Sequence, residues 1–218
     1  MIRRPGHRLA LALCLALTGG PVAAEEPPTA EAQFAAALQA HRAGHREEAA
    51  ALFRRLADAG DPQAQYNLAV LYHTGHGLPR HDGEALFWAW RAKLGGVPQA
   101  AALARQLARE RQAEAMPALA DRLMEELKPA LAAGDPRAAL GAAMIALELR
   151  TPPDRDEAIF WQSLAAALGL PGADAARDRS LAELPPAERD GLQDRVLERF
   201  RNWCADHPAP PDACAAAS

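Results

Sequence analysis

The sequence predicts an all-α protein, a right-handed α-solenoid of antiparallel helix pairs. Three observations predict this fold: the composition, the pattern of residues 61–100, and the recurrence of short motifs along the chain. Half of the 218 residues are apolar, and the abundant alanine, leucine, glutamate and arginine favour helices. β-Branched residues are scarce, and no run alternates as a strand would. Helix is therefore expected along most of the chain.

Residues 61–100 contain two amphipathic helical patterns on either side of a glycine-rich turn. Pro62 begins the first helix where no amide donor is needed, and Gly75 and Gly77 end it. Asp82 is the expected N-cap of the second helix, which ends at glycines 95–96. One face of each helix carries apolar side chains at helical spacing, and we expect these faces to be buried. They are Ala64, Leu68, Leu71 and Tyr72 on the first helix, and Ala85, Trp88, Ala89 and Ala92 on the second.

Short motifs return at two fixed shifts, which indicates a repeat protein. The pair Glu-Ala at 48–49 returns at 84–85, a shift of 36 residues and the length of one helix pair. Ala-Leu-Phe-Trp at 85–88 returns as Ala-Ile-Phe-Trp at 158–161, about twice that shift. A single pair cannot bury its own apolar face, whereas stacked pairs can, so a solenoid is expected. The first helix of each pair should line the concave surface.

The remaining helices are predicted from the caps, prolines and glycines between them. Thr29 is the expected cap of the first helix, and Pro117 and Pro129 lie near helix ends, where proline is tolerated. The array is expected over residues 25–203, as modules at about 29–110 and 111–203. The predicted helices span residues 29–43, 46–59, 62–74, 82–95, 98–109, 113–132, 136–149, 156–168, 172–183 and 186–203.

Residues 1–24 have the pattern of a secretory signal peptide, with cleavage expected before Glu25. Three arginines precede the apolar segment 9–17, and Val-Ala-Ala at 22–24 supplies the small residues of a cleavage site. An uncleaved anchor is the alternative, although this segment is much shorter than the ~20 apolar residues of a membrane span. No later segment is long and apolar enough to span a bilayer either. A periplasmic or secreted protein is therefore expected.

The predicted mature chain is acidic. Removing residues 1–24 takes away three arginines and no acid, which leaves 21 basic and 28 acidic residues and a net charge of −7 with neutral histidines. An acidic protein repels the phosphate backbone of nucleic acids. Nucleic acid is therefore not an expected partner.

Two cysteines, Cys204 and Cys214, remain after cleavage, in a proline- and alanine-rich tail at 204–218. In an oxidising compartment this pair predicts a disulfide. Closing so short a loop would contribute about 2–3 kcal/mol by chain entropy. A reactive Cys204 with His207 nearby is the alternative.

A family resemblance follows from residues 61–100, which combine Ala-Gln-Tyr-Asn-Leu-Ala at 64–69, Gly-His-Gly-Leu at 75–78, and Glu-Ala at 84–85 ahead of Trp88. Together these motifs resemble a Sel1-like repeat, a variant of the tetratricopeptide repeat. The second module resembles the family less, because Leu-Gly-Ala at 140–142 replaces Tyr-Asn-Leu. Lys93 also stands where the family usually has alanine. The resemblance implies an adaptor or scaffold for protein–protein interaction, often in bacterial envelope assembly, signalling or host contact.

No catalytic motif is evident, so the protein is predicted not to be an enzyme and to need no cofactor. The serines, Ser163, Ser180 and Ser218, lie outside any Gly-x-Ser-x-Gly motif. The glycines at 75 and 77 belong to a turn between helices, where they permit positive φ, rather than to a phosphate-binding loop.

Three histidines, His73, His76 and His81, surround this turn. With Asp82 as a further donor they could bind zinc or copper. Their spacing fits no standard zinc motif, so we favour a solvent-exposed turn decorated with polar residues. A metal-binding or enzymatic solenoid that uses this turn is kept as an alternative, as is a peptidoglycan-binding component of the envelope.

The expected partner-binding surface is the concave face of the helix at 62–74. The positions that its buried stripe leaves free are Gln63, Asn67, Val70 and His73. Asn67 is the best candidate to hold a peptide backbone, because its amide can both donate and accept. Trp90 points away from the side of Trp88. It either packs against the neighbouring pair or is an exposed anchor for a protein partner.

Overall fold

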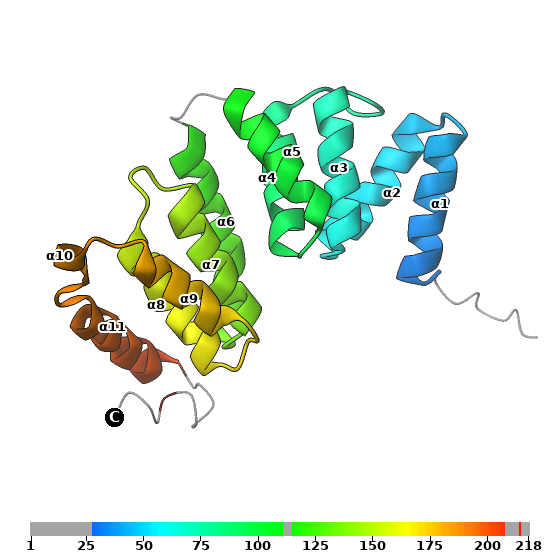
Figure 1. Ribbon diagram of the computed structural model, residues 1–218. Coiled ribbons are helices and arrows are strands. Elements are labelled where there is room, and N and C mark those ends of the chain that lie inside the picture. Colours follow the sequence, from blue (N-terminus) through cyan, green and yellow to red (C-terminus); the bar gives the residue numbers. More distant parts are fainter. Residues whose placement is uncertain (1–27, 111–114, 208–213, 215–218) are drawn as a thin grey trace, which may run out of the picture.

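A computed structural model describes residues 28–110, 115–207 and 214. The predicted signal peptide therefore lies outside the described residues. Across the described ranges the protein is all-α without any strand, and consecutive helices pack side by side in a row, as an α-solenoid of repeats (Figure 1). None of the described helices has the length and apolar character that a membrane span needs. In chain order they are α1 (Ala30–Arg42), α2 (Arg46–Asp58), α3 (Pro62–Thr74), α4 (Asp82–Leu94), α5 (Pro98–Glu110), α6 (Ala115–Ala132), α7 (Pro136–Glu148), α8 (Arg155–Ala167), α9 (Ala173–Ala182), α10 (Pro186–Arg189) and α11 (Leu192–Asp206).

The helix boundaries confirm most of the predicted caps and helix ends. The Asp61 carboxylate accepts a hydrogen bond from the amide of Ala64 at 2.8 Å, and Pro62 follows as the first residue of α3. Gly75 ends α3 with a φ of 71°. The predicted cap of α4 is wrong: Nδ1 of His81 accepts from the amide of Glu84 at 3.0 Å. Asp82 is the first residue of α4 instead.

The helix predicted over residues 186–203 is two helices. The short α10 ends at Arg189, and α11 begins at Leu192. Gly191 between them has a φ of 70°, in the left-handed region. Glycine adopts this conformation without strain, but it does not fit a right-handed helix. The chain therefore changes direction at Gly191, and α11 returns to pack against α8.

The larger apolar core extends from α1 to α7 and so passes the expected module boundary at residue 110. Helix α4 lies at its centre, where all six residues 85–90 are buried. Three ion pairs surround the contact of α4 with α6 and α7. They join Arg122 to Glu84 at 2.7 Å, Arg91 to Glu126 at 3.5 Å, and Lys93 to Glu148 at 2.6 Å.

The duplication detected in the sequence extends to a pair of helices that the sequence comparison did not match, α6 and α11. The guanidinium of Arg122 on α6 lies 3.4 Å from the ring centroid of Phe87, and that of Arg199 on α11 lies 4.7 Å from Phe160. The two phenylalanines are equivalent at a shift of 73 residues. Helix α11 therefore covers α8 much as α6 covers α4.

The turn between α1 and α2 touches the loop between α3 and α4. A Cβ atom added to Gly77 would lie 2.1 Å from the carbonyl oxygen of Arg46. Gly77 also has a φ of 79°, in the left-handed region. Only glycine fits this contact, because both the space and the backbone conformation exclude a side chain.

We expect Gly77→Ala to lower the free energy of unfolding by about 3 kcal/mol, because alanine adds backbone strain and a clash with Arg46. Gly44→Ala is the matched control, since Gly44 has a similar φ of 82° but no atom within 4 Å of an added Cβ. The control should lose only about 1 kcal/mol. Urea denaturation of both variants measures the difference, and equal losses would mean that the loop contact contributes nothing.

Candidate protein-binding surfaces

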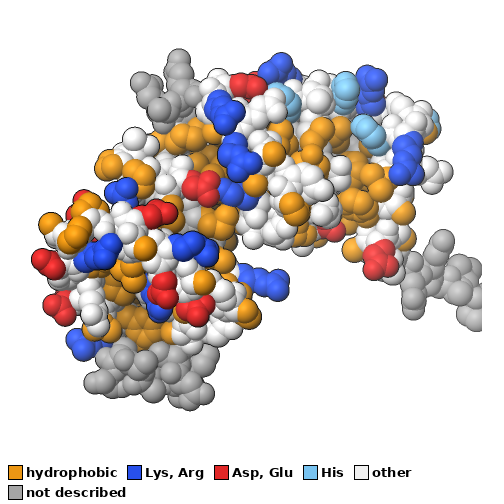
Figure 2. Space-filling view, in the orientation of Figure 1, with side chains coloured by type: hydrophobic (Ala, Val, Ile, Leu, Met, Phe, Trp, Pro, Cys, Tyr) orange, Lys and Arg blue, Asp and Glu red, His pale blue; other side chains and the backbone are white. Residues whose placement is uncertain are grey.

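An apolar groove of about 800 Å³ lies between α8, α9 and α11. Helix α8 forms its floor, and α9 and α11 pack against α8 on either side. Figure 2 shows apolar side chains between the charged groups of this region. Pockets of this size commonly bind ligands or partner side chains. The apolar lining consists of Ile159, Ala167, Leu181, Ala182, Leu192, Val196, Leu197 and Phe200.

The polar side chains of the groove are mostly engaged within the protein. Arg177 pairs with Asp178 at 2.8 Å. Arg189 donates to the carbonyl oxygens of Leu184 and Ala182, at 2.9 and 3.0 Å. The hydroxyl of Ser163 donates to the carbonyl oxygen of Ile159 at 2.7 Å. What the groove offers a partner is therefore mainly apolar surface.

The groove is open because small residues replace large ones at the repeat shift of 73 residues. Ser163 stands at the position of Trp90, and Ala167 at that of Leu94. In the first module Trp90 belongs to a buried cluster that also contains Ile145 of α7 and Leu149, the C-cap of α7. No helix follows α11 in the described part of the chain to supply such residues again.

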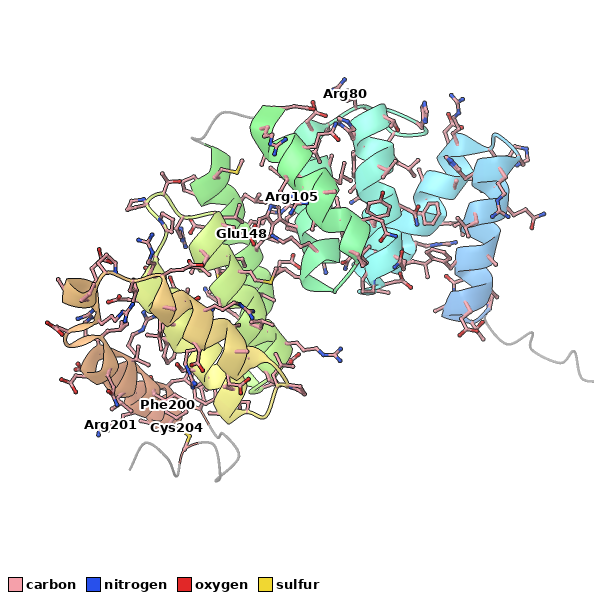
Figure 3. All side chains as sticks on the ribbon, in the orientation of Figure 1. Arg80, Arg105, Glu148, Phe200, Arg201 and Cys204 are labelled. Atoms are coloured by element: carbon pink, nitrogen blue, oxygen red, sulfur yellow. A yellow bond between two sulfur atoms is a disulfide. The ribbon has the colours of Figure 1, made fainter. Side chains whose placement is uncertain are left out.

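The predicted disulfide is present, at the C-terminal end of the helix that forms one wall of the groove. Cys204, in the last turns of α11, is bonded to Cys214. Both cysteines pack against the second core, to which Phe200 and Trp203 of α11 belong. Figure 3 labels Phe200 and Cys204 on this helix. The alternative of a reactive Cys204 is therefore wrong.

The residues predicted from helical phase lie along α3. Gln63 is exposed, and Asn67, Val70 and His73 are half-buried. The side-chain amide of Asn67 donates to the carbonyl oxygen of Gln63 at 2.9 Å. This donor is used within the helix, so the side-chain oxygen of Asn67 is what it offers a partner.

Trp90 is not an exposed anchor, and that interpretation is wrong. Its side chain is 3% exposed and belongs to the first core. The ammonium of Lys93 lies 3.9 Å from the centroid of its ring, while the same ammonium pairs with Glu148 of α7. Trp90 therefore packs at the junction with the second module, where Lys93 gives it a cation–π contact.

The three histidines of the α3–α4 loop have separate local environments. Nδ1 of His73 lies 3.2 Å from a carboxylate oxygen of Asp82, His81 caps α4, and His76 is exposed. In the ranges that the structure describes, no group of three or more His, Cys, Asp or Glu side chains is placed to hold a metal ion. The geometry therefore gives the metal-binding alternative no support.

Asp82 is the charged centre of this loop. Its carboxylate accepts hydrogen bonds from Arg80, which is the main reason that the pKa of Asp82 is lowered. Partial burial acts against this effect, and the hydrogen bond with His73 adds to it. Because Asp82 is held by side chains on both sides, it ties the end of α3 to the start of α4.

Neither a protein-family model nor a curated protein matches the sequence of this chain. The Sel1-like resemblance of residues 61–100 therefore remains an expectation.

We expect Asp82→Asn to lower the free energy of unfolding by about 0.5 kcal/mol at neutral pH, a small effect because the side chain is 35% exposed and screened by water. A carboxylate whose pKa is lowered in the folded state stabilises the protein at pH values above its unfolded-state pKa. This stabilisation is lost as the pH falls through its folded-state pKa. The difference should therefore be constant above about pH 5 and shrink below about pH 4.

Urea denaturation of Asp82→Asn and of the wild type, above about pH 5 and again below about pH 4, measures this effect. Asp58→Asn is the control, because Asp58 is exposed and makes no ion pair among the described residues. A destabilisation by Asp82→Asn that persists undiminished at low pH would contradict the role given to the Asp82 charge.

Proposed function

We propose that this protein is an exported, non-catalytic adaptor that binds a helical segment of a partner protein in the groove between α8, α9 and α11. The observation that supports the proposal is the groove itself, an opening of about 800 Å³ with a mainly apolar lining at the end of the array. Concave sites of this size and character are where proteins commonly bind ligands or partner side chains. The Sel1-like resemblance of residues 61–100 favours the same class of function.

The first module suggests what fits the groove. There the face of α4 that carries Trp90 and Leu94 is approached by α7. Ile145 of α7 and Leu149, the C-cap of α7, lie four residues apart and are only 1% and 2% exposed. Residues at this spacing lie on one face of a helix. A partner helix with two aliphatic side chains at positions i and i+4 would reproduce this packing on α8.

The groove is suited to binding because its walls are already in place. The packing of Phe200 and Trp203 in the second core holds α11 against α8. A preformed site spares the free energy of ordering on association. Burying two large aliphatic side chains would contribute about 1.5–3 kcal/mol each before the costs of association.

Export is supported by two features of different kinds. Residues 1–24 have the composition of a signal peptide. The Cys204–Cys214 disulfide is a bond that persists in oxidising compartments such as the periplasm and the extracellular space. Both features favour a partner protein outside the cytoplasm.

A photo-crosslinking amino acid at Leu197 tests the proposal in intact cells. Leu197 lines the groove but belongs to none of the packed core clusters, so its replacement should leave the fold intact. The same amino acid at the exposed Ala175 of α9 is the control. We expect a protein adduct at Leu197 alone, mapped by mass spectrometry to a segment with helical apolar periodicity. Adducts to lipid or glycan only, or equal adducts at both sites, would overturn the proposal.

Ser163→Trp provides a second test, because it fills the groove with the residue found at the equivalent position in α4. The mapped partner segment, made as a synthetic peptide, should bind this variant at least about tenfold more weakly than the wild type. Ala175→Trp adds the same side chain outside the groove and should bind normally. Circular dichroism and thermal unfolding check that both variants fold. Unchanged affinity of folded Ser163→Trp would place the binding site elsewhere.

A further inference from the structure

A histidine- and arginine-rich edge lies in the N-terminal half of the array, away from the groove. It is formed where the α1–α2 turn, the α3–α4 loop and the end of α5 meet (Figure 1). Figure 2 shows blue and pale-blue side chains along this edge, and Figure 3 labels Arg80 there. We call it the histidine edge. Its charged and titratable residues are His41, Arg42, His45, Arg46, Glu47, Glu48, His73, His76, Arg80, His81, Asp82, Arg109 and Glu110.

The histidine edge is one continuous surface rather than separate loops. The backbone of Gly77 is in contact with the backbone of Arg46, which joins the two turns. His73 and Arg80 both bind the carboxylate of Asp82, which fixes the loop on α4. The charges on these elements are therefore held close together.

The charge of this edge depends on its histidines. Its four arginines and four acids cancel, and the neighbouring Glu84, which also faces His81, is paired with Arg122 of α6. The net charge of the edge is therefore near zero when the histidines are neutral. Five of the seven histidines of the chain lie here. Histidine is the side chain that gains a charge as the pH falls from about 7.5 to about 5.5. Protonation of His41, His45 and His76, which are exposed, would therefore add positive charge to the edge, while the rest of the mature chain stays acidic. His81 is the exception, because its Nδ1 accepts the hydrogen bond from the amide of Glu84.

Several of these cations are available to a partner. Arg42, Arg46 and Arg109 make no ion pair among the described residues, and the same is true of His41 and His76. Most of the acids, in contrast, are already engaged. Asp82 binds Arg80 and His73, Glu48 lies 3.5 Å from His45, and Glu110 accepts from Gln106 at 3.3 Å.

We propose that the histidine edge binds an acidic polypeptide segment, and that this binding strengthens as the pH falls through the range in which histidine is protonated. A flexible chain of carboxylates can reach cations spread over three turns, whereas a compact anion would meet only one or two of them. The acidic remainder of the protein would repel such a segment and so direct it to this edge. The inference uses a surface separate from the groove, so either proposal can fail without the other.

The test uses the full mature protein and a fluorescently labelled peptide rich in glutamate and aspartate. Binding is measured by anisotropy at about pH 5.5 and about pH 7.5 in dilute salt. Each exposed charge contributes little, but several together should tighten binding about tenfold at the lower pH. The gain should shrink in concentrated salt because the interaction is electrostatic. A neutral peptide of the same length is the ligand control.

Two variants of the partnerless histidines separate this role from folding. His41→Gln with His76→Gln should clearly reduce the pH dependence, because these two side chains can then no longer gain a charge. His41→Lys with His76→Lys should tighten binding several-fold at neutral pH, because the charge is then permanent. Arg179, an exposed cation on α9, provides the control. Arg179→Gln should change neither the pH dependence of binding nor the affinity at neutral pH.

Three results would overturn the inference. The first is acidic-peptide binding that is equally tight at both pH values. The second is a pH dependence that is undiminished in His41→Gln with His76→Gln, in a protein that folds normally by circular dichroism. The third is binding to vesicles of anionic lipid at the lower pH without binding to the peptide, since that would assign the edge to a membrane surface instead.

Discussion

The burial of α4 on every side is the constraint on which the N-terminal half depends. An amphipathic surface helix buries one stripe, but residues 85–90 of α4 are buried without interruption. Helices α3 and α5 cover two of its sides, and α6 and α7 cover what remains. The ion pairs of Arg91, Lys93 and Arg122 with α6 and α7 lie at the rim of this contact. The two modules are thereby joined through one helix.

The second module repeats this plan around α8, but leaves it incomplete. Phe160 and Trp161 occupy the positions of Phe87 and Trp88, and α11 covers α8 as α6 covers α4. The side of α8 that carries Ser163 has no helix corresponding to α7 upon it in the described chain. The same geometry therefore makes a core in one module and an open groove in the other. A repeat protein gains a binding surface in this way without any change of fold.

The two candidate surfaces differ in chemistry. The groove is apolar, with most of its polar groups engaged within the protein. The histidine edge is charged, and its arginines are largely free. Apolar packing and pH-dependent charge would select partners by different physical properties.

The sequence by itself determined the all-α class, most helix boundaries and the disulfide, because caps, prolines, glycines and apolar spacing act over a few residues. It misplaced the cap of α4, where Arg80 and His73 engage Asp82, and it missed the break at Gly191. One feature of the sequence indicates the groove: Ser163 stands at the position equivalent to Trp90. Whether this small residue leaves an opening depends on which helix covers the face of α8 that carries it. The tertiary structure alone decided that Trp90 is buried and that the groove stays open, because coverage depends on residues distant in the chain.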